Sequence, residues 1–358
     1  MKKVLEKIKM PLLAVTISLI FGAIVILLLK KNPLEAYSAF LQGAGLLPKA
    51  NYGGNQNQLS DFFVFLDGTA PMIFASLAIV ISLKGGLFNI GVAGQMLLSG
   101  FFATILVGYS PLPGLVAKPI VILIGLVVGG ILGGIVGYLK AKFNINEVVS
   151  TIMFNYIIQY TTSYFIQTSF VDPVSRQSKY ILSSASLTFK GVSAFGVKLD
   201  ISISFFLAIL VAIYLNYFLN KKKDGFEIKM VGLNRKGSEY AGVNVEKTII
   251  KTMVISGALA GLAGVSYYLG YMQSIQPGVL GSLGFNAIAT ALLGGVNSIG
   301  VIFASLLLTI LDRGSVFMSS RLGIVKEISG VITSIILIFS AISGYIGLKL
   351  SERKKEER

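Results

Sequence analysis

Residues 11–29 read PLLAVTISLIFGAIVILLL, an apolar run that carries no charge. About 20 apolar residues in a helix are enough to cross the hydrocarbon core of a bilayer. The run is long, it ends in Lys30 and Lys31, and it lacks a small-residue cleavage site. We therefore interpret it as a retained membrane helix and not as a cleaved signal peptide.

The composition of the whole chain agrees with a membrane protein. Of the 358 residues, 54% are hydrophobic and 13% are charged, with a mean hydropathy of +0.78. A soluble domain could not cover so much apolar surface, and a disordered chain would be more polar. Cysteine and histidine are both absent, which excludes disulfides, thiolate or imidazole catalysis and most zinc sites.

Apolar runs and basic residues together predict the topology. The runs predict ten spans, at 11–29, 62–83, 92–108, 118–139, 149–168, 201–219, 250–271, 284–312 (two short helices joined at Gly294 and Gly295) and 328–349. With the N-terminus inside, 20 of the 31 basic residues fall on the inner side and 11 on the outer side, as the positive-inside rule requires. The net charge of +15 then fits loops that face anionic lipid, with no need for nucleic acid.

The predicted fold class is thus an all-α polytopic membrane protein with about ten transmembrane helices, some broken or re-entrant. We expect one transmembrane domain over residues 1–358, with both termini in the cytoplasm and a cytoplasmic tail at 350–358. Residues 32–61 and 169–200 are predicted external loops, the first with a short interfacial helix in NPLEAYSAFLQGAG. Each loop is either a simple connection or a docking surface for something outside the cell, and the sequence leaves both open.

Glycine spacing predicts where helices pack closely. Gly125, Gly129, Gly133 and Gly137 recur every four residues, which makes one helix face smooth enough for another backbone to approach. The stretch GALAGLAG at 257–264 predicts a second close contact of the same kind. We expect a compact helical bundle.

Amides, hydroxyls and aromatic rings are the polar groups inside the predicted spans. The stretch GGLFNIGVAGQ at 85–95 breaks a helix at membrane depth, which is tolerated where the backbone is buried in protein or lines a cavity. Such groups either join helices together or hydrogen-bond and stack a neutral polar solute. No lysine or arginine is predicted at mid-membrane, which disfavours an anionic solute. The candidate solute-pathway residues are Phe88, Asn89, Gln95, Asn155, Tyr156, Gln159 and Asn286.

The largest predicted cytoplasmic loop covers residues 221–249. Within it, residues 236–241 can form a short helix with Asn234 at its N-terminus and Gly242 at the turn after it, although an ordinary solvated loop is the alternative. No GxxxxGK[ST] motif occurs in the chain, so any ATP hydrolysis of that type needs another subunit.

Four motifs in order carry a family resemblance. They are GGLFNIGVAGQMLLSG (85–100), NINEVVSTIMFNYI (144–157), VGLNRKGSEYAGVNVEK followed by SGALAGLAG (231–264), and ATALLGGVNSIG (289–300). Together they resemble the membrane permease subunits of bacterial ABC importers for simple sugars and nucleosides, over residues 62–345. The NPLEAYSAFLQGAG segment and the length are more similar to the nucleoside branch than to the ribose or galactose branch.

The resemblance implies a type II-like importer in a bacterial cell membrane, and a transporter subunit that is not itself an enzyme. A second permease, identical or paralogous, would complete the pathway, and an external solute-binding protein or lipoprotein would deliver the solute. Cytoplasmic ABC ATPase subunits would bind ATP and Mg²⁺, so no cofactor is expected in this chain. The implied contacts to the ATPase are Gly232, Asn234, Glu239, Tyr240, Ala241 and Gly242.

Three alternatives remain beside nucleoside import. The same permease role for a ribose, galactose or autoinducer-type sugar changes only the cargo. An ion-coupled secondary carrier would need no ATPase, but no carboxylate is predicted at mid-membrane and the chain has no histidine. An intramembrane enzyme is disfavoured for the same lack of catalytic groups.

Overall fold

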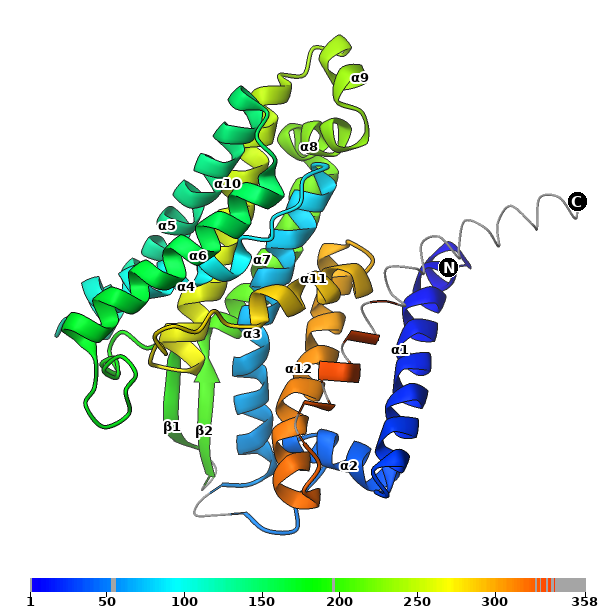
Figure 1. Ribbon diagram of the computed structural model, residues 1–358, viewed down its shortest axis with the longest axis vertical. Helices are drawn as coiled ribbons and strands as arrows, with labels where there is room; N and C mark the ends of the chain where they lie inside the picture. The colour runs from blue at the N-terminus through cyan, green and yellow to red at the C-terminus, as the bar shows by residue number, and fades with distance from the viewer. Residues whose placement is uncertain are drawn as a thin grey trace, which may run out of the picture. The chain divides into compact units, whose positions relative to one another are not determined.

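A computed structural model describes residues 2–52, 56–194 and 197–325, together with 327, 328, 330–332, 334, 335 and 338. The described chain is mostly helical (Figure 1). In chain order the elements are α1 (Lys2–Leu28), α2 (Pro33–Gly43), α3 (Gln58–Lys84), α4 (Val92–Ala103), η1 (Thr104–Gly108), α5 (Gly114–Phe143), α6 (Glu147–Phe165), η2 (Ile166–Phe170), β1 (Thr188–Ala194), β2 (Val197–Ser202), α7 (Ile203–Lys221), α8 (Lys223–Leu233), α9 (Arg235–Tyr240), α10 (Val245–Ser266), η3 (Tyr267–Tyr271), α11 (Leu283–Leu293) and α12 (Ser298–Leu322).

Nine of the ten predicted spans coincide with helices, and most of the tenth, 328–349, lies outside the described residues. Among the described residues, five helices are long and apolar enough to cross a membrane. They are α3, α5, α7, α10 with η3, and α12. A bent pair, Val15–Leu28 with Pro33–Gly43, makes a sixth if it counts as one span. The chain is therefore a multi-pass helical membrane protein, and the count of ten stays a prediction.

The chain divides into two compact units, each assembled from distant parts of the sequence. The first comprises Met1–Phe65, Ser193–Leu199 and Ile288–Arg358, and the second comprises Leu66–Val192 and Asp200–Ala287. The predicted single domain over 1–358 thus stays a prediction. All the candidate site residues named above fall in the second unit.

In the first unit, α2 packs on α12 through two glycines. A Cβ on Gly43 would lie 2.8 Å from the Gly314 Cα, and a Cβ on Gly314 would lie 2.4 Å from the Phe40 Cα. The N-cap of α2 is Asn32, whose side chain accepts the Leu34 N–H at 3.0 Å. The helix predicted in NPLEAYSAFLQGAG is therefore present, and the chain bends by 117° between α1 and α2.

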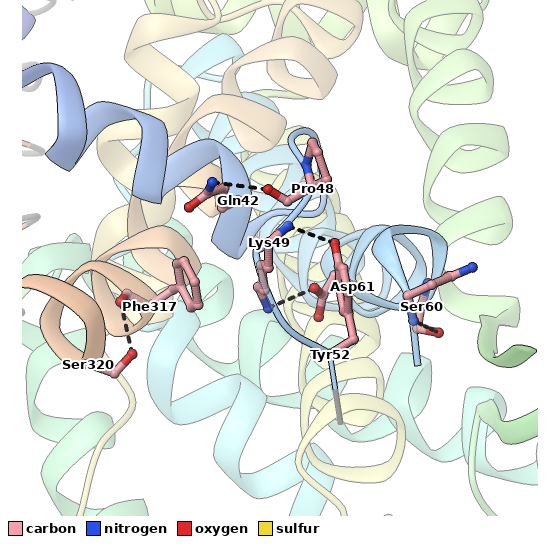
Figure 2. Close-up of polar contacts among 9 residues, drawn as sticks. Gln42, Pro48, Lys49, Tyr52, Ser60, Asp61, Phe317 and Ser320 are labelled. Atoms are coloured by element: carbon pink, nitrogen blue, oxygen red, sulfur yellow. Dashed lines mark hydrogen bonds and ion pairs between the residues drawn. The ribbon is translucent and has the colours of Figure 1, made fainter. Parts of the chain in front are cut away.

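A polar network fixes the loop that follows α2 (Figure 2). The Lys49 ammonium forms an ion pair with Asp61 at 2.7 Å and lies 4.7 Å from the centre of the Phe317 ring. The Gln42 side chain donates to the Pro48 carbonyl at 3.0 Å. One cation thus ties this loop to the start of α3 and the end of α12.

In the second unit, α5 and α10 meet along the predicted glycine faces. A Cβ on Gly129 would lie 2.2 Å from the Gly257 carbonyl oxygen, and a Cβ on Gly261 would lie 1.8 Å from the Gly125 carbonyl oxygen. These separations exclude any side chain, so only glycine permits the contact. Both glycine predictions are confirmed by this packing.

Three helices of the second unit, α4, α6 and α10, end in π-helical turns, η1, η2 and η3. The segment 171–188 donates backbone N–H groups to carbonyl oxygens at all three ends: Leu182 to Gly108 (2.8 Å), Lys179 to Phe170 (3.0 Å) and Leu187 to Leu269 (3.0 Å). The Thr188 hydroxyl also donates to the buried Asp67 carboxylate at 2.7 Å. This segment therefore satisfies backbone oxygens that helix ends leave without partners.

Three features differ from the sequence predictions. Strands β1 (Thr188–Ala194) and β2 (Val197–Ser202) form a two-stranded sheet, so the fold is not wholly α-helical and the predicted loop 169–200 contains structure of its own. The predicted cytoplasmic loop likewise contains α8, whose Gly225, Ile228 and Val231 are buried. Helix α12 continues to Leu322, ten residues past the predicted end, and therefore also includes Arg313.

The glycine contact gives a matched pair of substitutions. We expect Gly129→Ala to lower the free energy of unfolding by about 1–3 kcal/mol, because the new methyl overlaps the Gly257 carbonyl. Gly130→Ala, one residue away, places its methyl at 3.7 Å from its nearest neighbours and is expected to be neutral or stabilising. Thermal unfolding of the two purified variants checks this. Equal midpoints would show that α5 and α10 do not pack this closely.

Candidate functional site

The break between α3 and α4 is the structural centre of the candidate site. It begins after Lys84, where Gly86 adopts a φ of +67°, and it ends at Gly91, the N-cap of α4. A Cβ on Gly85 would lie 2.6 Å from the Thr252 side chain of α10. The break therefore packs against α10, as a buried, non-helical backbone must.

Asn89 holds this break in place. Its side-chain nitrogen donates to the Gln95 Oε1 at 2.9 Å and to the Ser256 Oγ at 2.8 Å, and its oxygen accepts the Gly91 N–H at 3.0 Å. The Ser256 hydroxyl in turn donates to the Ala78 carbonyl at 2.7 Å. One buried carboxamide thus joins α3, α4 and α10.

A second amide joins α6 to the same break. The Asn155 side chain donates to the Ile90 carbonyl at 3.1 Å and accepts the Gly94 N–H at 2.9 Å. Asn155 is 3% exposed, and Gly94 lies so close that a Cβ there would meet the Asn155 oxygen at 2.5 Å. We call Asn89, Gln95, Asn155 and Ser256 the amide cluster.

The short helix predicted at residues 236–241 is present as α9, at Arg235–Tyr240. Asn234 is its N-cap and accepts the Gly237 N–H at 3.0 Å, while the Ser238 hydroxyl donates to the Asn234 carbonyl at 2.8 Å. Gly242 follows with a φ of +79°, the left-handed conformation that favours glycine after a helix. Tyr240 is 94% exposed at the end of α9. The helix thus presents an aromatic ring that the described chain does not cover.

The end of α8 touches the break directly. A Cβ on Gly232 would lie 2.1 Å from the Lys84 carbonyl oxygen, and the Arg235 guanidinium donates to the Gly86 carbonyl at 3.4 Å. The predicted ATPase-contact region and the break between α3 and α4 are therefore in direct contact.

Three of the seven predicted pathway residues, Asn89, Gln95 and Asn155, are buried and hydrogen-bonded to protein in the amide cluster. The other four are more open. Gln159 donates to the Gly278 carbonyl at 2.7 Å, Phe88 and Asn286 are half-buried, and Tyr156 is 56% exposed. A role for any of the seven in solute contact stays a prediction.

Two exposed side chains on α6 are not among the seven predicted pathway residues. Tyr160 is 68% exposed and Tyr164 is 64% exposed, and both follow Tyr156 at intervals of four residues. Residues four apart share a helix face. The spacing was visible in the sequence, but the fold was needed to show that this face is uncovered.

Comparison with known proteins places the chain in a family. Residues 63–341 match the model of the branched-chain amino acid transport system / permease component family. The chain belongs to this permease family. It is 34% identical over 357 residues to the nucleoside ABC transporter permease protein NupB of Lactococcus lactis, covering 98% of this chain and 94% of that protein.

Two further relatives differ in the solute that their names give. The guanosine ABC transporter permease protein NupP of Bacillus subtilis is 34% identical over 358 residues, covering 99% of each chain. The glucose ABC transporter permease protein TsgB13 of Haloferax volcanii is 25% identical over 336 residues, covering 92% of this chain and 86% of that protein.

The amide cluster gives a second testable prediction. Asn89→Ala leaves the partners of that carboxamide buried without a hydrogen bond, so we expect it to lower the free energy of unfolding by about 1–3 kcal/mol. Ser99→Ala on α4 removes a buried hydroxyl that has no hydrogen-bond partner in the described part of the chain, and it is expected to be close to neutral. Thermal unfolding in one detergent compares the two, and an Asn89 variant as stable as the Ser99 variant would contradict the cluster's role.

Proposed function

We propose that this chain is the membrane-spanning permease subunit of an ATP-driven importer for nucleosides. The observation that carries the proposal is the pair of relatives named as nucleoside and guanosine permeases, each 34% identical over nearly the whole length of both chains. The candidate pathway agrees, because α6 and η2 contain one charged residue, Glu147 at the inner end, and offer amides, hydroxyls and rings to a neutral solute.

The finer architecture is part of the proposal. About ten transmembrane helices, some broken, form a type II-like permease in a bacterial cell membrane, with both termini in the cytoplasm. Short α11 and the break before α4 are the broken elements. Residues 221–249 and the segment 171–188 lie at opposite ends of α10 (Figure 1). In this proposal the first end faces the cytoplasm and the second faces outside.

The partners follow from this orientation. A second permease completes the pathway, and an external binding protein delivers the solute to the outer loops. Cytoplasmic ABC ATPases bind ATP and Mg²⁺ and dock on Gly232, Asn234, Glu239, Tyr240, Ala241 and Gly242. Two exposed apolar side chains support a docking role for this region: Tyr240 at 94% and Leu233 at 83%. Such side chains on a soluble face are typical of a protein interface.

Within the proposed pathway, the exposure of the side chains supports two different roles for the seven residues. Tyr156, Gln159, Phe88 and Asn286 are open enough to meet the solute, whereas Asn89, Gln95 and Asn155 position the break. Energy from the ATPase would reach the break through Gly232 and Arg235, which already contact Lys84 and Gly86.

Sugar import is the second candidate function. Its support is the glucose permease relative, which is similar over 92% of this chain, although at 25% identity. The two functions share the permease role and differ only in the cargo.

Uptake by the complete importer separates the cargo classes. We expect excess guanosine or uridine to compete with labelled guanosine, while guanosine monophosphate competes at least about tenfold less well, because a phosphate needs a buried cation. Glucose is the control competitor. Glucose uptake with no nucleoside uptake would establish the second candidate function instead.

Docking at α9 gives a test by co-purification. Replacing Glu239 and Tyr240 together with alanine is expected to weaken ATPase binding by about 1–3 kcal/mol, the usual cost of truncating central interface side chains, and to reduce uptake in proportion. The control is Tyr180→Ala, a 65% exposed tyrosine in the segment 171–188. If both variants retain the ATPase equally, α9 is not the docking contact.

A further inference from the structure

Three tyrosines form an exposed row on one face of α6. Tyr156, Tyr160 and Tyr164 are 56%, 68% and 64% exposed. Each interval of four residues rises about 6 Å along a helix, so the three rings cover about 12 Å of the helix face. We call these three side chains the tyrosine row.

The depth of the row is unusual for tyrosine in a membrane protein. α6 and η2 run without interruption from Glu147 to Phe170, so Tyr156 and Tyr160 lie on either side of the midpoint of this helix. Exposed tyrosines normally lie at the membrane surfaces. Tyr217 on α7 follows that rule, since it is 50% exposed and lies one turn from Lys221 at the helix end.

Lipid is a poor neighbour for the three tyrosine hydroxyls. A phenol hydroxyl in hydrocarbon has no hydrogen-bond partner, which is costly. In keeping with this, α6 is not among the described helices that are apolar enough to cross a membrane by length and composition alone. The hydroxyls suit water and a polar solute better than lipid chains, while Ile152, Met153 and Ile157 beside them are exposed and apolar.

The chemistry of the row selects one class of solute. A tyrosine ring offers a flat surface on which a nucleobase stacks, and its hydroxyl both donates and accepts hydrogen bonds. The only charged group on α6 and η2 is Glu147, nine residues before Tyr156, so no cation on the helix would hold a phosphate. Gln159 points to the neighbouring segment and donates to the Gly278 carbonyl at 2.7 Å, which fixes that backbone beside the row.

We propose that Tyr156, Tyr160 and Tyr164 are solute-contacting residues on which the base of a neutral nucleoside stacks in turn as it crosses the membrane. This inference rests on the proposed function and deepens it, because it assigns base selection to three named rings. Equivalent rings about 6 Å apart give several contacts of similar strength, so the solute can move from one to the next without being trapped at one site.

The test removes the rings while keeping apolar bulk. Two double variants are compared in proteoliposomes that contain the complete importer: Tyr156→Leu with Tyr160→Leu, and Tyr156→Phe with Tyr160→Phe. The matched control is Tyr217→Leu, at a 50% exposed position one turn before the end of α7. Guanosine and uridine uptake are measured with solute-stimulated ATP hydrolysis, and co-purification reports assembly with the second permease and the ATPase.

We expect the leucine pair to lower guanosine uptake by about tenfold or more, as loss of base stacking does elsewhere. Uridine uptake should fall less, because a pyrimidine offers a smaller ring surface. The phenylalanine pair should stay within about threefold of wild type, and uptake by the Tyr217→Leu variant should be unchanged.

Each contrary result has a separate meaning. Full nucleoside uptake by the leucine pair would overturn the row as a solute contact and leave the importer function intact. Loss of the second permease from the leucine pair would show that the face is a dry protein interface, which also overturns the proposal. A wild-type importer that takes up glucose and no nucleoside would overturn both the row and the proposed function.

Discussion

A broken helix inside a membrane protein must find a partner for every backbone group that the break exposes, because no water is present to replace the lost hydrogen bonds. This constraint organises the second unit. Side-chain amides hydrogen-bond the backbone groups in and beside the break at 85–91. Asn89 accepts the Gly91 N–H, while Asn155 donates to the Ile90 carbonyl and accepts the Gly94 N–H. An amide suits the task because it donates and accepts without carrying a charge into the interior.

Glycine makes the amide contacts possible by letting helices come close together. Between α5 and α10, carbonyl oxygens lie where a Cβ would otherwise be, at Gly129 and Gly261. Gly264 of α10 packs against α4 in the same way, because a Cβ on Gly264 would lie 2.1 Å from the Met96 carbonyl oxygen. Since α10 also carries Ser256, this close packing brings the serine within 2.8 Å of Asn89. Each hydrogen bond contributes modestly, but leaving any of these groups unpaired would cost more than the bond itself contributes.

The sequence predicts what depends on local spacing. The glycine intervals predicted the α5 and α10 faces, and Asn234 with Gly242 predicted the two ends of α9. Contacts between residues that are far apart in the chain could not be predicted from the sequence. Asn89 and Ser256 are 167 residues apart, so no local pattern shows that they meet. Neighbours on α6 diverge for the same reason: Asn155 is buried and Tyr156 is exposed, and only the fold distinguishes their faces.

Helix α8 and the strands β1 and β2 were missed for a different reason. The stretch KKKDGFEIKM begins with a run of charges that is typical of a solvated loop, and its apolar face consists of few residues. The strands are short. They directly follow the segment 171–188, whose backbone N–H groups donate to carbonyl oxygens at the ends of α4, α6 and α10. Almost every residue has a backbone N–H group, so the residue types in the sequence do not show which of these groups form such hydrogen bonds.

The position of the amide cluster explains how a displacement at α8 and α9 could reach the pathway. Gly232 leaves no free space against the Lys84 carbonyl, so a shift of α8 toward the break must move residues 84–86 with it. Asn89 lies three residues farther on and is bonded to Ser256 of α10 and Gln95 of α4. A second route runs from Gly242 into α10, which begins at Val245. Both routes meet at Asn89 and Ser256. A buried, fully bonded amide at that junction would transmit a displacement because it cannot rotate away without losing its partners, which supports the proposal that the cluster positions the helices while open side chains such as Tyr156 meet the solute.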